Sequence, residues 1–156
     1  MAHIITAIIG KSASETITGD AYKLPSFALR QGFTMIGLND GHCKYWSSQF
    51  NPEVLPQLKG SKTTVSLDLP IVHYWANEFF GQRYALIETE YFGGVGTQSA
   101  SLYDSLEVVV SSEGDGSINQ ILKALGVRRT CFRDHFACLE LEKYRHFRDH
   151  FSRHDK

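Results

Sequence analysis

The feature that most constrains the fold is the sequence YALIETEYFGGVG at residues 84–96. Its apolar first half predicts a buried strand, and its glycines allow a tight turn because glycine adopts positive φ at little cost. The pattern is typical of a strand that leaves a core and turns at once into its neighbour. Residues 99–103 and 106–110 then predict a hairpin about Asp104 and Ser105, followed by a polar loop at 111–116.

Other short segments, apolar or alternating, predict the remaining strands. The pair on either side of Gln31 and Gly32 has the form of two strands around a tight turn. The residues Asn39–Gly41 are a second turn signal. The predicted strands are residues 4–9, 27–30, 33–38, 43–46 and 63–67.

Helices are predicted where a capping residue precedes an apolar stripe. Asp68 can cap a helix that has Pro70 in its first turn and ends at Gly81. Ser117 can cap a helix over 118–125 that ends at Gly126. A last helix is predicted from about residue 134 past 147, whereas residues 50–58, with two prolines, predict a short helix at most.

These elements predict one α+β domain over residues 1–156. We expect a mixed or mostly antiparallel sheet with about three or four helices, concentrated late in the chain. Because chain ends fray, we expect residues 146–156 to be a frayed C-terminal tail.

Composition narrows the class of protein. Hydrophobic residues make up 42% of the 156 residues and charged residues 21%, as in globular domains. The net charge of −1 gives no support for binding nucleic acid or an acidic membrane. The sequence has no apolar run of about 18 residues, and its three cysteines include no Cys-x-x-Cys pair. We therefore expect a cytoplasmic protein without a cofactor that binds neither nucleic acid nor membrane.

The first candidate site lies at the end of the strand at 84–91. Glu88 and Glu90 are two residues apart, so their side chains share one face and could act as acid and base or bind a hard cation. The alternative is that the strand leaves the core here and the two glutamates are only solvent-exposed. Phosphate-binding spacings are absent, because Gly96 is followed by Thr-Gln. The candidate ligand-binding residues are Glu88, Glu90, Tyr91, Phe92, Gly93, Gly94, Gly96 and Gln98.

Other histidines and the cysteines are further candidates for chemistry. On a continued last helix, His146 and His150 lie four residues apart and could hold a metal ion, although the same helix has an aromatic stripe that favours packing. Cys43 on a strand cannot meet the adjacent His42, because neighbouring side chains face opposite ways. Cys138 on a helix could touch His135, but a buried inert thiol is commoner. No Gly-x-Ser-x-Gly elbow is present.

Three segments together resemble a known group of proteins. They are residues 87–98 (IETEYFGGVGTQ), residues 118–127 (INQILKALGV), and DHF at 134–136 with LEKYR at 141–145. The chain resembles small uncharacterised bacterial proteins in which an EYFGGVGxQ-type loop precedes an INxxLxxLGV-type helix. The resemblance implies a bacterial protein but no activity, since the group has none assigned. The His-rich end after residue 145 departs from the pattern.

The absence of a catalytic signature and the high aromatic content, 12% of residues, favour a binding protein. We expect contact with a partner protein in an immunity-like or regulatory role, or with further copies of the chain. The alternative is an enzyme or small-ligand binder that uses Glu88 and Glu90. The sequence does not decide whether the protein is an enzyme.

Overall fold

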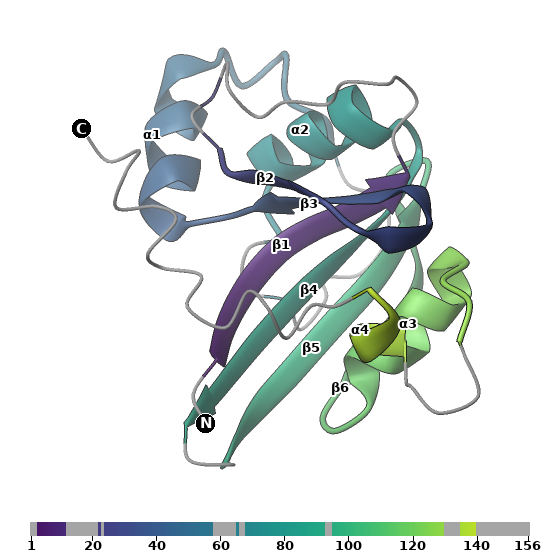
Figure 1. Ribbon diagram of the computed structural model, residues 1–156. Coiled ribbons are helices and arrows are strands. Elements are labelled where there is room, and N and C mark those ends of the chain that lie inside the picture. The colour runs from purple at the N-terminus through teal and green to yellow at the C-terminus, as the bar shows by residue number, and fades with distance from the viewer. Residues whose placement is uncertain are drawn as a thin grey trace.

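The computed structural model describes residues 3–11, 22, 24–57, 65, 68–92, 95–129 and 135–139. These residues form a six-stranded sheet with helices on both faces (Figure 1). Every strand pairing in the sheet is antiparallel. The predicted single α+β domain, with a mostly antiparallel sheet and three or four helices, is confirmed.

The strand order is β2-β3-β1-β4-β5-β6, so β1 and β4 lie in the middle of the sheet. β4 and β5 form the hairpin that the glycine-rich segment predicted, with Tyr91 opposite Gly96 near its tip. The strands are β1 (His3–Lys11), β2 (Ser26–Ala28), β3 (Phe33–Gly37), β4 (Arg83–Phe92), β5 (Val95–Asp104) and β6 (Glu107–Glu113).

The helices form two layers around the sheet. Helices α1 (Asp40–Gln49) and α2 (Pro70–Phe80) cover one face, while α3 (Ser117–Leu125) and the short α4 (His135–Cys138) cover the other (Figure 1). A 3₁₀ turn, η2 (Arg30–Gly32), joins β2 to β3.

Each face of the sheet has its own apolar cluster, and β4 contributes to both. Ala85 and Ile87 pack with α3, whereas Tyr84 and Leu86 pack with α2. Because successive side chains alternate between faces, a strand buried on both sides reads as a continuous apolar run. This explains why residues 84–87 are uniformly apolar.

Gly10 allows α2 to approach the sheet closely. A Cβ atom built on Gly10 would lie 2.5 Å from Cγ of Phe80, so any larger residue displaces that ring. The close packing places the end of α2 directly on β1.

Several local predictions are confirmed. α2 begins at Pro70 and ends at Gly81, whose φ of 79° suits glycine. α3 ends at Gly126 with φ of 112°. The pair of strands around residues 31 and 32 is also present as β2 and β3.

The predicted strand at 43–46 is wrong, because these residues belong to α1. Asn39 is the helix cap, since its Oδ1 accepts a hydrogen bond from the His42 N–H at 3.1 Å. The turn signal at 39–41 was therefore the start of a helix, and α1 comes earlier in the chain than the helices that we expected. No helix forms over the described part of 50–58, where residues 52–54 form a turn.

Two predicted caps are also wrong. Leu69 is the N-cap of α2, and the Asp68 side chain bonds instead to His73. Gly116 is the N-cap of α3, and the Ser117 hydroxyl donates to the Gly114 carbonyl at 2.5 Å. The predicted loop at 111–116 is shorter than expected, because residues 111–113 extend β6.

Two predictions fall mainly outside the described residues. Of the strand predicted at 63–67, only Val65 is described, and it is buried. Of the last helix, His135–Cys138 is described as α4, and residues 146–156 lie outside the described ranges.

Candidate functional site

The two candidate glutamates lie on the face of the sheet that α1 and α2 cover. Glu88 is opposite Thr6 of β1 and Ser99 of β5, and Glu90 is opposite Thr97. Both share the face of Tyr84 and Leu86, as the alternation of a strand requires. Glu88 is half-buried and Glu90 is exposed.

Beyond Leu86 this face of the sheet becomes polar. We call Glu88, Glu90, Thr97, Ser99 and Glu113 the polar end of the sheet. Ser99 lies between Glu88 and Glu113 on the neighbouring strands, which places the backbones of these two glutamates about 9–10 Å apart. The three glutamates alternate with hydroxyl groups, so this surface is acidic and able to accept hydrogen bonds.

The structure separates Gln98 from these glutamates. Gln98 is opposite Thr89 and therefore faces α3, where its Oε1 accepts a hydrogen bond from the Ile118 N–H at 3.4 Å. Its role is to satisfy a free amide at the start of that helix. Gly96 is exposed at the hairpin tip.

The remaining candidate residues fall outside what the structure describes. The backbones of Tyr91 and Phe92 end β4, but their side chains are not described. Gly93 and Gly94 lie outside the described ranges. The same holds for His146 and His150, so their predicted metal site stays a prediction.

Sequence reasoning missed a buried polar network between α2 and the sheet. His73 Nε2 lies 2.6 Å from Asp68 Oδ1, and His73 Nδ1 lies 2.5 Å from the Tyr84 hydroxyl. Tyr84 stacks on Tyr103 at 5.5 Å between ring centres, and the His73 ring meets Tyr103 edge-on at 4.6 Å. We call Asp68, His73, Tyr84 and Tyr103 the His73 network.

The contacts pair each ring nitrogen of His73 with one oxygen. With the imidazole hydrogen on Nε2, that nitrogen donates to the Asp68 carboxylate and Nδ1 accepts from the Tyr84 hydroxyl. Burial, with smaller contributions from Tyr103 and Asp68, raises the pKa of Tyr84 well above its usual range. The hydroxyl therefore stays protonated and able to donate.

The order acid, histidine, hydroxyl is also that of the catalytic triads. However, His73, Tyr84 and Tyr103 are all 0% exposed, and a substrate cannot reach a hydroxyl in this position. The network instead joins Asp68 and α2 to the middle of the sheet. Its signal in the sequence was a histidine within the apolar helix 71–80, since buried polar groups are almost always hydrogen-bonded.

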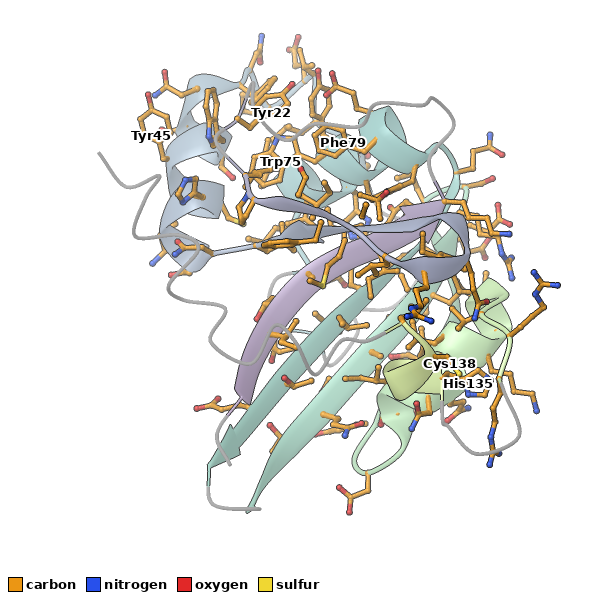
Figure 2. All side chains as sticks on the ribbon, viewed as in Figure 1. Tyr22, Tyr45, Trp75, Phe79, His135 and Cys138 are labelled. Atoms are coloured by element: carbon orange, nitrogen blue, oxygen red, sulfur yellow. The ribbon has the colours of Figure 1, made fainter. Side chains whose placement is uncertain are left out.

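A second surface lies on the outer side of α1 and α2. Aromatic rings there form a continuous series of contacts. The ring centre of Trp46 lies 5.2 Å from that of Tyr45 and 6.5 Å from that of Phe50, and Phe50 lies 4.9 Å from Tyr74. Figure 2 shows Tyr22 and Tyr45 at this side of the molecule, above the buried Trp75 and Phe79. We call the following residues the aromatic surface: Tyr22, Tyr45, Trp46, Phe50 and Tyr74.

Polar bonds hold the aromatic surface in place. The Trp46 indole N–H donates to the Tyr22 carbonyl at 3.1 Å, and the Tyr22 hydroxyl donates to Glu78 at 3.0 Å. Burial and the nearby Glu78 carboxylate raise the pKa of Tyr22. The Tyr45 side chain remains 57% exposed. Val54, four residues after Phe50 in the sequence, is 55% exposed.

Helix α1 buries little of its own surface. Cys43 is its buried residue, at 0% exposure, and burial raises the pKa of its thiol from 9.0 to about 12, with help from Asp40. The thiol therefore stays protonated, and a nucleophilic role is disfavoured. On α4, Cys138 is also buried, at 5% exposure.

No family model, curated protein or solved structure matches this chain. Among the described residues, no group of three His, Cys, Asp or Glu side chains is arranged to hold a metal ion. Within the same ranges no helix is long and apolar enough to cross a membrane. The resemblance to small bacterial proteins stays a prediction.

Proposed function

We propose that the protein acts by binding another protein through the aromatic surface, in a regulatory or immunity-like role. The observation that carries this proposal is the exposure of a large aromatic side chain there, Tyr45 at 57%. Aromatic residues are enriched in protein interfaces because they bury large area at low cost in side-chain entropy.

The composition around these rings also resembles an interface. Lys44 and Asp40 form an exposed ion pair at 3.0 Å on the same helix, next to Tyr45 and Trp46. An apolar centre with a charged rim is the usual anatomy of a protein–protein contact. The rings beneath Tyr45 are already fixed by contacts with Tyr22 and Phe50, so binding orders few additional side chains.

The test is a binding measurement with Tyr45→Ala. A central tyrosine contributes about 2 kcal/mol or more to an interface, which corresponds to a dissociation constant about 30-fold weaker. Partners are captured with the immobilised protein from the source cells, identified, purified and measured by calorimetry. Gln120→Ala, exposed on α3 at the opposite face, is the matched control. Equal affinity for wild type and Tyr45→Ala would remove the aromatic surface from the proposal.

A second copy of the chain is another occupant for this surface. Sedimentation equilibrium distinguishes the cases, because self-association of wild type that Tyr45→Ala abolishes indicates a homo-oligomer instead of a different partner.

The alternative function, a small-ligand binder or enzyme, has one supporting observation. Glu88 and Glu90 share a face with Glu113, so a cation or a basic ligand would meet several carboxylates. Against it, Gln98 faces the other side of the sheet, where it serves α3. We therefore favour the protein-binding role.

A further inference from the structure

β6 is an edge strand of the sheet. It is the last strand in the order, and among the described residues it pairs only with β5. Its seven residues contrast with the opposite edge, where β2 has three. A long edge offers a row of backbone groups to an additional strand.

The hydrogen-bond alternation identifies the backbone groups that face outward. The Gly114 N–H donates to the Gln98 carbonyl at 2.9 Å, which makes this a hydrogen-bonded pair. Every second pair along an antiparallel ladder is of this kind, so Ser112 and Val110 also bond to β5. The N–H and C=O groups of Ser111 and Glu113 therefore point away from β5, toward the open edge.

The side chains of β6 suit strand addition by a particular partner. Residues 108–110 are three valines, which favour extended backbone, and Val109 is 52% exposed next to the bulge at Leu102 and Tyr103. Glu107 and Glu113 lie at the two ends, about 20 Å apart, and both are exposed.

These charges disfavour a second copy as the occupant. In an antiparallel pair of two β6 strands centred on Val110, Glu107 of each copy would meet Glu113 of the other. Like charges directly opposite destabilise a pair of strands, whereas opposite charges stabilise it. The complementary occupant is an extended segment with Lys or Arg near both ends.

We propose that the outer edge of β6 binds an extended, basic segment of a partner protein as a seventh strand of the sheet. This extends the proposed protein-binding role to a second surface. Figure 1 shows α1 and β6 on opposite sides of the molecule. The two proposed binding surfaces are therefore separate, and an experiment can refute one of them without refuting the other.

The experiment is selection of displayed random 12-residue peptides on the immobilised wild-type protein. The enriched peptides should alternate β-branched with other residues and carry Lys or Arg near both ends. Their synthetic versions should shift the backbone amide resonances of Ser111 and Glu113 more than those of α1. Enrichment of peptides without basic residues, or none above an empty support, would overturn the proposal.

Two variants test the geometry with the selected peptides. Ser111→Pro removes an outward N–H that β5 does not use, while Ser111→Ala keeps it, and both lose the same 2.9 Å bond between the Ser101 and Ser111 hydroxyls. We expect binding at least about tenfold weaker in Ser111→Pro than in Ser111→Ala.

The double variant Glu107→Lys/Glu113→Lys should also weaken binding about tenfold, because its lysines would face the basic ends of the peptide. It is the test to use if Ser111→Pro does not fold. Unchanged binding by a folded Ser111→Pro, or by the double-lysine variant, refutes strand addition at β6. A wild-type dimer that Ser111→Pro dissociates would make a second copy the occupant and equally refute it.

Discussion

Tyr84→Phe isolates the contribution of one hydroxyl group to the stability of the fold. The phenol ring of Tyr84 stays in place, because it stacks on Tyr103 with 18° between the ring planes. The hydroxyl that donates to His73 Nδ1 at 2.5 Å is lost. Since His73 is 0% exposed, water cannot replace the donor.

The expected cost follows from the orphaned acceptor. A buried polar group left without its partner costs roughly 1–3 kcal/mol. The void left by one oxygen atom is small, so the orphaned Nδ1 dominates the change. Against a typical total of about 5–15 kcal/mol, the free energy of unfolding should fall by a measurable fraction.

The measurement is urea unfolding followed by tryptophan fluorescence. Wild type and Tyr84→Phe should differ in midpoint but share the same dependence on urea, because the surface exposed on unfolding is unchanged. Tyr45→Phe is the control, since it removes a hydroxyl from a tyrosine that is 57% exposed. It should cost less than about 0.5 kcal/mol.

A double-mutant cycle with Asp68→Ala extends the test. Asp68→Ala leaves the other nitrogen of His73, Nε2, without its acceptor. Because both changes act through one imidazole ring, their costs should differ from additivity by roughly 0.5–3 kcal/mol. If Tyr84→Phe is as mild as Tyr45→Phe, or if the two costs are additive, the His73 network does not stabilise the fold as a unit.

Three further predictions use other parts of the structure. Gly10→Ala should destabilise by roughly 1–3 kcal/mol in urea unfolding, because its Cβ would lie 2.5 Å from the Phe80 ring, and trimming that ring with Phe80→Leu should recover part of the loss. The free energy of unfolding should fall as the pH rises from 9 toward 12, because the unfolded state loses the Cys43 proton above pH 9.0 while the folded state holds it to about pH 12. Cys43→Ala should flatten this decline by up to about 1.4 kcal/mol per pH unit, and an unchanged slope would contradict the burial of the thiol. If the polar end of the sheet binds a small ligand, a thermal-shift screen with divalent cations, nucleotides and metabolites should raise the melting temperature of wild type but not of Glu88→Gln/Glu90→Gln. No shift, or equal shifts in both, would remove that alternative.

Local signals in the sequence predicted most of the fold. Pro70 and Gly81 define α2 through backbone constraints that act within one turn of helix. The uniformly apolar residues 84–87 predicted a buried strand for the same reason, because alternation between two apolar faces leaves no polar position. The α+β class follows from these elements.

The local predictions failed where the same residue type is common in two different local structures. Asn39 is equally suited to a turn and to a helix cap, and the three residues after it do not distinguish them. Asp68 precedes a proline-started helix as a cap would, yet its partner is the imidazole of His73.

Most of the candidate site could not be predicted, because it depends on contacts between residues that are far apart in the sequence. That Glu88 and Glu90 share a face follows from strand geometry alone. That Glu113 faces Glu88 across Ser99 depends on the register of β4, β5 and β6. The aromatic surface depends on how α1 packs on α2, and its rings are separated by up to 52 residues of sequence, between Tyr22 and Tyr74.

The alternation along β4 also disfavours other registers of this strand in the sheet. Thr89, between the two glutamates, is 1% exposed, and its hydroxyl accepts a hydrogen bond from the Ile5 N–H at 3.1 Å. A slip of β4 by one residue would exchange the faces and drive Glu88 and Glu90 into the apolar layer beneath α3. Burying a carboxylate there is strongly unfavourable, so the two glutamates reject the wrong alignment. Whether or not they bind a ligand, Glu88 and Glu90 therefore favour the native register of the β4–β5 hairpin.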